Sequence, residues 1–163
     1  MEKNISIIGR AERIQLVDFS EEYIPAKVDT GADLSSIWAS EIKETPKYLS
    51  FVLFDKKSAH YTGKAIRLPS SEYKLTRISN SFGTKEMRYV VKLKIRIHGR
   101  TVKTTFTLAD RQQKTYPVLL GRRLLHRKFL VDVSRNASAL LDQERTKKQK
   151  LRHELKHHKG THA

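Results

Sequence analysis

The feature that most constrains the fold is a strict alternation of apolar and polar residues in the stretch YVVKLKIRIHGRTVKTTFTLADR, residues 89–111. From position 91 to position 97, every second side chain is apolar and the side chains between them are basic. A period of two is typical of a β-strand with one buried face. His-Gly-Arg at 98–100 predicts a turn, and Val102, Thr104, Phe106 and Leu108 continue the pattern on the return strand. The stretch therefore predicts a long antiparallel hairpin with a basic outer face.

Shorter segments on both sides of this hairpin also have the character of strands. They are ISIIG, RIQLVDF, IPAKVDT, SFVLFD and KAIRLP. Downstream, YPVLLGRRLLHRKFLVDV predicts an apolar strand, a break at Gly-Arg, a short helical turn and a last strand. Residues 34–38 (LSSIW) are expected to leave an acidic turn as a helix. These segments predict one mainly β domain over residues 1–135.

The character of the sequence changes after this domain. Residues 136–163 are rich in helix formers and charge but have few apolar positions. Such a segment can bury little surface, so we expect a basic tail that is either helical or disordered.

The net positive charge of the folded part indicates which classes of partner it can attract. The chain has 33 Lys and Arg against 17 Asp and Glu, a net charge of +16. Residues 41–135 hold 22 of these basic residues and 7 of the acidic ones, a net charge of +15, so the positive field belongs to the body. A field of that sign attracts polyanions such as nucleic acid, including the ribosome, anionic lipid or acidic peptides.

Cysteine and long apolar runs are both missing from the sequence. Without cysteine there are no disulfides, no thiolate chemistry and no cysteine–zinc sites. The first residues lack the apolar core of a signal peptide, and no apolar run approaches the length of a transmembrane helix. We therefore expect a cytoplasmic protein with no membrane association.

The stretch KVDTGADLSS, residues 27–36, carries the one candidate for a catalytic carboxylate in a turn, Asp29-Thr30-Gly31. A carboxylate that activates water needs a fixed and partly desolvated position, and a glycine turn lets backbone amides approach it closely. The tripeptide alone is weak, because Asp, Thr and Gly are all common in ordinary turns.

A second segment, VLLGRRLL at residues 118–125, adds specificity. Together with DTGAD at 29–33 it resembles the two signature segments of the retroviral-type aspartic proteases, in the same order. IPAKVDTGADLSS, RYVV, TLADR and YPVLLGRRLLHRKFLVDVS resemble more closely a bacterial retropepsin-like aspartic peptidase domain long known under the name ATP-dependent zinc protease. This likeness covers roughly residues 5–135. The chain has no P-loop to support ATP dependence.

The resemblance implies a fold, an activity and partners. The fold would be a retropepsin-like closed or partly open β-barrel with a short helix after the Gly-Arg segment. The activity would be that of an aspartic endopeptidase that needs no cofactor. Genes for this domain often neighbour, or are fused to, genes for ATP-grasp ligases that add glutamate to protein ends. Together with the basic body, this implies an acidic, glutamate-rich polypeptide substrate.

The resemblance also implies roles for individual residues. Asp29 would be the catalytic carboxylate, Thr30 would tie two active-site turns together, and Gly31 would offer its carbonyl to the substrate backbone. Ala32 stands where a serine or threonine could donate to the ionised carboxylate, so activity is expected to extend toward neutral pH. The remaining site-supporting residues would be Asp33, Gly121 and Arg122, with the Arg122 guanidinium holding the Asp33 carboxylate through two parallel hydrogen bonds.

A dyad needs two aspartates, but the chain has one Asp-Thr-Gly. A C2 homodimer would set Asp29 opposite its symmetry mate. Two close carboxylates cannot both ionise easily and so share a proton, which gives one base for water and one acid for the scissile carbonyl. The alternative function is an inactive retropepsin-fold module that binds RNA, the ribosome or an acidic partner.

His153, Glu154 and His157 match H-E-x-x-H, the zinc motif of metalloproteases. The segment is polar all round and offers no third ligand in the place where the longer motif needs one, so we expect no metal centre. For two further features the sequence allows two interpretations each. Residues 55–63 are either a flap over the substrate or a plain surface hairpin, and Arg111 is either structural or substrate-facing.

Overall fold

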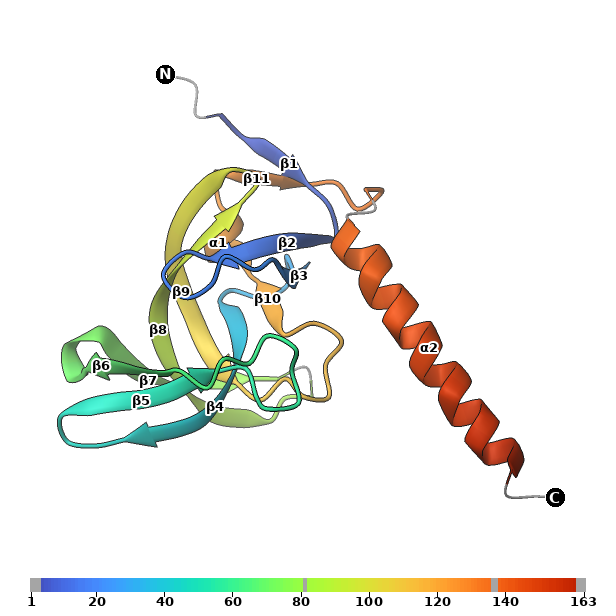
Figure 1. The fold of residues 1–163 in the computed structure, drawn as a ribbon. Helices are drawn as coiled ribbons and strands as arrows, with labels where there is room; N and C mark the ends of the chain where they lie inside the picture. The colour runs from blue at the N-terminus through green and yellow to red at the C-terminus, as the bar shows by residue number, and fades with distance from the viewer. Residues whose placement is uncertain (1–3, 81, 136–137, 161–163) are drawn as a thin grey trace.

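The computed structural model describes residues 4–80, 82–135 and 138–160, and β-strands make up most of it (Figure 1). In chain order the elements are β1 (Ser6–Ile8), β2 (Ala11–Leu16), β3 (Ile24–Val28), β4 (Ser35–Glu44), β5 (Tyr48–Leu53), β6 (Ala65–Pro69), the 3₁₀ turn η1 (Ser70–Glu72), β7 (Tyr73–Ser79), β8 (Lys85–Ile97), β9 (Arg100–Ala109), β10 (Val118–Leu120), α1 (Arg122–Leu125), β11 (Phe129–Val131) and α2 (Ser138–Gly160).

The predicted central hairpin is confirmed as β8 and β9, which pair antiparallel from Val90↔Thr107 to Ile97↔Arg100. The apolar positions from Val91 to Ile97 are buried, whereas Lys92, Lys94 and the other basic residues between them are exposed. His98 and Gly99 both have positive φ angles, 48° and 71°, as a tight turn matching the twist of the two strands requires.

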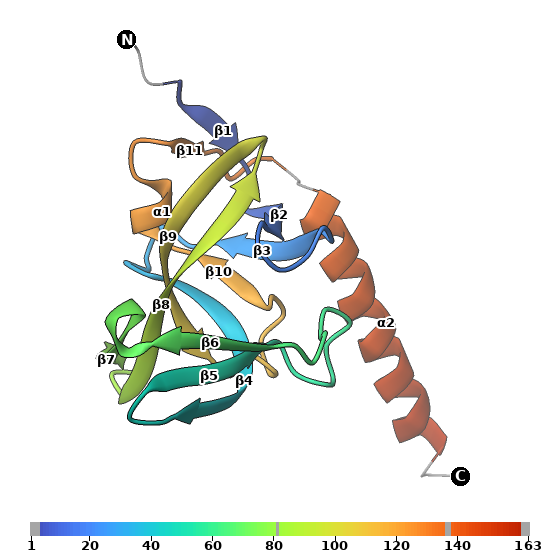
Figure 2. The ribbon, with the colours of Figure 1, turned by 60° about the vertical axis from the view of Figure 1, so that its left-hand side comes forward.

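The main sheet curls around the apolar core in the order β10-β3-β2-β8-β9-β4-β5-β6, and β7 pairs with the outer part of β8. The short strand β10 pairs with β3 in parallel and with β4 antiparallel, so it joins the two flanks of the curled sheet. β1 and β11 form a separate two-stranded sheet. The result is a partly open β-barrel with α1 at one end, as Figure 2 shows.

The core consists of the inward side chains of these strands. Phe51, Phe106, Ile95 and Leu120 have no exposed surface. Burial of each such side chain contributes roughly 1.5–3 kcal/mol, which holds β10 against β3 and β4. This packing matters for function, because β3 and β10 carry the two signature segments.

The expected helix at residues 34–38 is wrong, since β4 begins at Ser35. Five consecutive residues of this strand, 35–39, are buried. The strand pairs with β9 on one edge and with β10 on the other. Ile37 and Trp38 favour strands, and two neighbouring strands offer hydrogen bonds that an isolated helical turn of five residues could not replace.

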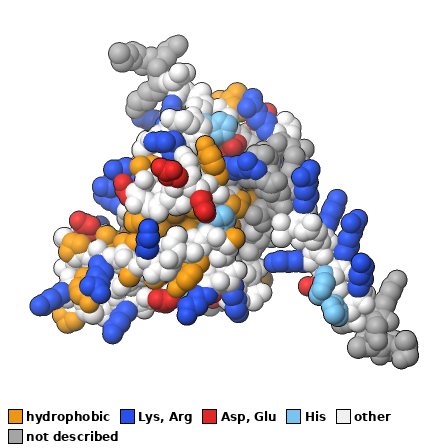
Figure 3. All heavy atoms as spheres, in the orientation of Figure 1, with side chains coloured by type: hydrophobic (Ala, Val, Ile, Leu, Met, Phe, Trp, Pro, Cys, Tyr) orange, Lys and Arg blue, Asp and Glu red, His pale blue; other side chains and the backbone are white. Residues whose placement is uncertain are grey.

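The tail forms the helix α2, the first of the two expected states. It starts beside β2 and β3, and its far end projects from the barrel (Figures 1 and 2). Lys and Arg side chains are spread over the barrel and along α2, with few acidic side chains between them (Figure 3). Among the described residues, no helix is both long enough and apolar enough to cross a bilayer.

Candidate active site

Asp29 lies directly after β3, at the start of a tight turn. Its backbone N–H donates to the Leu120 carbonyl at 2.9 Å, which continues the pairing of β3 with β10. The Gly31 N–H donates to Asp29 Oδ1 at 2.9 Å, and the Ala32 N–H donates to the Asp29 carbonyl at 3.3 Å. The backbone of Asp29 is therefore held on both sides, and its half-buried carboxylate accepts one backbone hydrogen bond.

Gly121 braces the turn from behind. Its N–H donates to the buried Ser35 hydroxyl at 3.0 Å. A Cβ at this position would lie 2.6 Å from both the carbonyl carbon and the oxygen of Leu34, and 3.0 Å from the Ala32 oxygen. Only glycine allows β10 to approach the turn this closely.

Arg122, the first residue of α1, closes the turn from the other side. Its N–H donates to the Ala32 carbonyl at 2.8 Å. Its Nη1 donates to the carbonyl oxygens of Thr30 at 3.1 Å and of Gly31 at 2.8 Å. The Gly31 carbonyl that was expected to face substrate thus already accepts one hydrogen bond, and its second lone pair is left for a further donor. Thr30 and Gly31 are exposed at the tip.

The expected pairing of Asp33 with Arg122 is wrong. Asp33 pairs instead with Arg123, whose Nη2 lies 3.1 Å from Asp33 Oδ2. The Arg123 N–H also donates to the Asp33 carbonyl, at 3.1 Å. The Arg122 side chain is occupied by the turn carbonyls, so the next residue of α1 faces the carboxylate. Both partners are more than half exposed, and such a pair contributes less than about 1 kcal/mol.

Two arginines, Arg88 and Arg111, lie within electrostatic reach of each other, and Arg111 is also within reach of Asp29. The Arg111 Nε donates to the Tyr116 carbonyl at 2.9 Å, and the Arg88 Nη1 lies 3.5 Å from the Thr107 hydroxyl. Burial lowers the pKa of Arg111, the positive charge of Arg88 lowers it further, and the Asp29 carboxylate opposes both effects. Arg111 is therefore within electrostatic reach of Asp29. From the sequence, Arg111 was a candidate for either a structural or a substrate-facing role, and Arg88 was not identified as a site residue.

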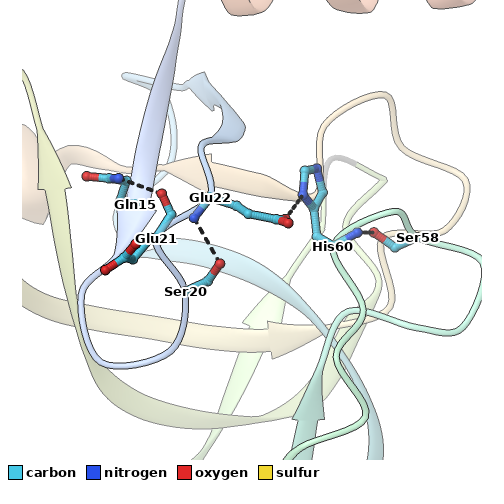
Figure 4. A network of polar contacts seen from close by, with 6 residues as sticks. All are labelled: Gln15, Ser20, Glu21, Glu22, Ser58 and His60. Atoms are coloured by element: carbon cyan, nitrogen blue, oxygen red, sulfur yellow. Dashed lines mark hydrogen bonds and ion pairs between the residues drawn. The ribbon is translucent and has the colours of Figure 1, made fainter.

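Residues 55–63 form the loop between β5 and β6 and fold back onto the barrel. The His60 ring lies against Phe54 at 5.6 Å between ring centroids, and His60 Nδ1 lies 3.8 Å from Glu22 Oε2 (Figure 4). Tyr61 donates its hydroxyl proton to Glu41 at 2.9 Å. Burial lowers the pKa of His60 more strongly than Glu22 raises it. These contacts favour a plain surface hairpin over a flap.

The H-E-x-x-H segment lies on α2, with His153 and His157 exposed. Their Nε2 atoms are 3.2 Å apart, so the two rings face each other as the motif predicts. No group of three or more His, Cys, Asp or Glu side chains able to hold a metal occurs within 4–80, 82–135 and 138–160. A catalytic zinc needs a third protein ligand and an oriented surrounding shell, so these residues do not fit such a centre.

Comparison with known proteins adds the family context. The family model RimB-like, described as retropepsin-like aspartic endopeptidase RimB, matches residues 7–140. A probable α-L-glutamate ligase of Shewanella pealeana is 33% identical over 138 residues, which are 82% of this chain and 30% of that protein. A ligase of the same description from Desulfotalea psychrophila is 26% identical over 77% of this chain and 28% of its own length.

Among solved structures, a Legionella pneumophila protein of unknown function is similar at a TM-score of 0.61. Its sequence identity is 27%, and the match covers 82% of this chain and 98% of that one. The present chain thus spans about 30% of the length of the curated relatives and nearly the whole of the solved one.

Proposed function

This chain belongs to the RimB-like family of retropepsin-like aspartic endopeptidases, and from that premise we propose that it hydrolyses peptide bonds as a homodimer. The catalytic groups would be Asp29 of one chain and Asp29 of its partner. The observation that carries the proposal is the braced turn at the end of β3: the Gly31 N–H donates to the half-buried Asp29 carboxylate, while Gly121 and Arg122 fix the backbone of the turn.

The chemistry follows from two carboxylates at one symmetry axis. With one proton between them, the ionised carboxylate takes a proton from water while the protonated one donates to the scissile carbonyl. The Gly31 N–H donates to Asp29 Oδ1 and so favours the ionised form of this oxygen. Thr30 is exposed at the tip of the turn, where the matching turn of a second chain would meet it.

The substrate we propose is an acidic polypeptide that bears glutamates. The relatives are named probable α-L-glutamate ligases, and this chain matches about 30% of their length. In our proposal, the shared part is the peptidase that acts on chains carrying added glutamate. The net charge of +15 over residues 41–135 supports this, because it would concentrate such substrates near the barrel.

The β7–β8 hairpin is our proposed flap in place of residues 55–63. Phe82 near its tip is 92% exposed, and the hairpin leads along β8 directly to Arg88. An apolar side chain at the tip of such a hairpin could close over a bound peptide.

The test is digestion of a mixed peptide pool that includes glutamate-rich members, by wild type and by Asp29→Asn, between about pH 4 and pH 8. We expect cleavage by wild type alone, with faster cleavage of the acidic peptides at low salt. Equal cleavage by both proteins would remove Asp29 from the mechanism. No cleavage by a dimeric wild type would favour the binding module, whose mark would be salt-dependent RNA binding unchanged in Asp29→Asn.

A further inference from the structure

A row of four paired residues crosses the barrel beside Asp29. Ser36 of β4 pairs with Thr107 of β9 and with Leu119 of β10, and Thr107 pairs with Val90 of β8. Paired residues of neighbouring strands point to the same face of a sheet. Leu119 also pairs with Lys27, two residues before Asp29, so the row lies on the face to which Asp29 belongs.

Two hydroxyls in this row have few hydrogen-bond partners. Ser36 is 5% exposed, and its hydroxyl has no hydrogen-bond partner among the described residues. Thr107 is 2% exposed, and its hydroxyl makes only long contacts, 3.4 Å to the Ser35 carbonyl and 3.5 Å to Arg88 Nη1. A buried hydroxyl without a good partner is destabilising, so a polar ligand atom at this place would supply a missing hydrogen bond.

Two guanidinium groups belong to this region: Arg88 reaches the Thr107 hydroxyl, and the charge of Arg88 acts on Arg111. Arg88 lies two residues from Val90 along β8, its side chain is only 21% exposed, and it forms an ion pair with Glu86. Arg111 lies two residues beyond the end of β9 and is half-buried, and its Nε is fixed by the Tyr116 carbonyl. No carboxylate lies within 4.0 Å of Arg111 in the part of the chain that the structure describes.

In the proposed dimer these charges would not balance. Each chain would bring the Arg88–Glu86 ion pair, and Arg111 within electrostatic reach of Asp29. When the two Asp29 carboxylates share a proton, one negative charge faces two Arg111 guanidinium groups. One positive charge is then left over in a partly buried site, which a single carboxylate of a ligand would neutralise.

We propose that Arg88 and Arg111 form a subsite that binds a glutamate or aspartate side chain of the substrate close to the scissile bond, with the two hydroxyls of the row on its floor. This inference rests on the proposed function, because it places the acidic side chain beside the carboxylates that would perform hydrolysis. Planar guanidinium groups suit this ligand, since they bind carboxylates through two parallel hydrogen bonds. The alternative is that Arg111 has a purely structural role. In that case its hydrogen bond to the Tyr116 carbonyl would be its whole contribution, and it would not bind the substrate.

The experiment measures binding, so that it does not depend on turnover. The full chain carrying Asp29→Asn is titrated with a fluorescent glutamate-rich peptide and with a series in which one glutamate at a time is glutamine. About 0.15 M salt screens the general attraction of the basic surface. We expect the glutamine replacement at one peptide position to weaken binding about tenfold, as for the loss of a charged hydrogen bond.

The same series is then measured with Arg111→Gln and Arg88→Gln added. We expect the effect of that peptide position to fall to about twofold or less in each, because the pairing partner is gone. The matched control is Arg96→Gln, which removes the same charge from β8 at an exposed position eight residues further along the strand, roughly 26 Å of strand length. In this control the tenfold effect should remain.

Thermal unfolding shows which variants are folded. If Arg111→Gln does not fold, the test of the subsite uses Arg88→Gln alone. The subsite is refuted if no peptide position matters, or if the effect persists in the folded arginine variants. The proposed function fails separately, by lack of cleavage in wild type. A peptidase whose glutamate preference ignores both arginines would contradict the subsite alone.

Discussion

Gly121→Ala is the substitution for which the structure gives the clearest magnitude. The new methyl group would lie 2.6 Å from two backbone atoms of Leu34, whereas ordinary contact begins near 3.4 Å. The turn must therefore move by about 0.8 Å, the difference between these distances. Overpacking of this kind costs about 1–3 kcal/mol, and we expect the upper end because backbone cannot rotate away as a side chain can. The backbone angles of Gly121 (φ −95°, ψ 177°) suit alanine, so the clash alone is tested.

The assay is urea unfolding together with peptide cleavage. The matched control is Gly99→Ala, where nothing lies within 4 Å of the new methyl group but φ is +71°. It should cost about 1 kcal/mol through strain and leave activity intact. Gly121→Ala should lose activity as well, because the displaced Leu34 belongs to the segment that carries Asp29. A Gly121→Ala protein within about 0.5 kcal/mol of wild type and fully active would refute this reasoning.

Three further predictions concern single side chains. Arg122→Gln should lower the free energy of unfolding by about 1 kcal/mol and reduce cleavage, because two turn carbonyls lose a charged donor, whereas Arg123→Gln should cost about 0.5 kcal/mol or less. Equal losses in urea unfolding would contradict this contrast. Burial lowers the pKa of His60 below its unfolded value of 6.5, so its contribution to stability is complete above that pH and is lost as the pH falls below it. Between pH 7.5 and pH 5.5, the Tm of His60→Gln should therefore fall by less than the Tm of wild type. An equal fall in both proteins would exclude His60 as the cause. A chelator should leave cleavage unchanged, as should His153→Ala, because no third metal ligand accompanies the motif among the residues that the structure describes. Cleavage lost on chelation and restored by zinc would contradict the aspartic mechanism.

The sequence predicted those parts of the fold that depend on local pattern. The alternation from Val91 to Ile97 identified β8, its turn and its buried face, because one side of a strand must be apolar to join a core. The Asp29 turn and the Gly-Arg break before α1 were likewise readable, since each uses residues suited to turns and helix starts. The resemblance implied a contact between these segments through Asp33 and Arg122, whereas the structure joins them through Gly121, whose N–H donates to Ser35 in a close backbone approach.

Features that depend on tertiary pairing were not readable. Residues 35–38 contain two serines and gave no alternation, because both faces of β4 are buried there. The partner of Asp33 depends on which arginine of α1 points toward the turn carbonyls, and neighbouring arginines look alike in sequence. The row that joins Ser36 to Thr107 brings together residues far apart in the chain, and only the register of β4 on β9 reveals it.

The most direct test of the shared-dyad mechanism is a subunit-mixing experiment. Wild type at a fixed concentration, high enough for the chain to be dimeric, is equilibrated with increasing Asp29→Asn, and cleavage of an acidic peptide is followed. If both carboxylates of a dimer are required, the rate should fall with the wild-type fraction, to about half at an equal mixture and about one quarter at a threefold excess of Asp29→Asn. A rate that does not change as Asp29→Asn is added would mean that one Asp29 suffices, and it would contradict the two-chain active site.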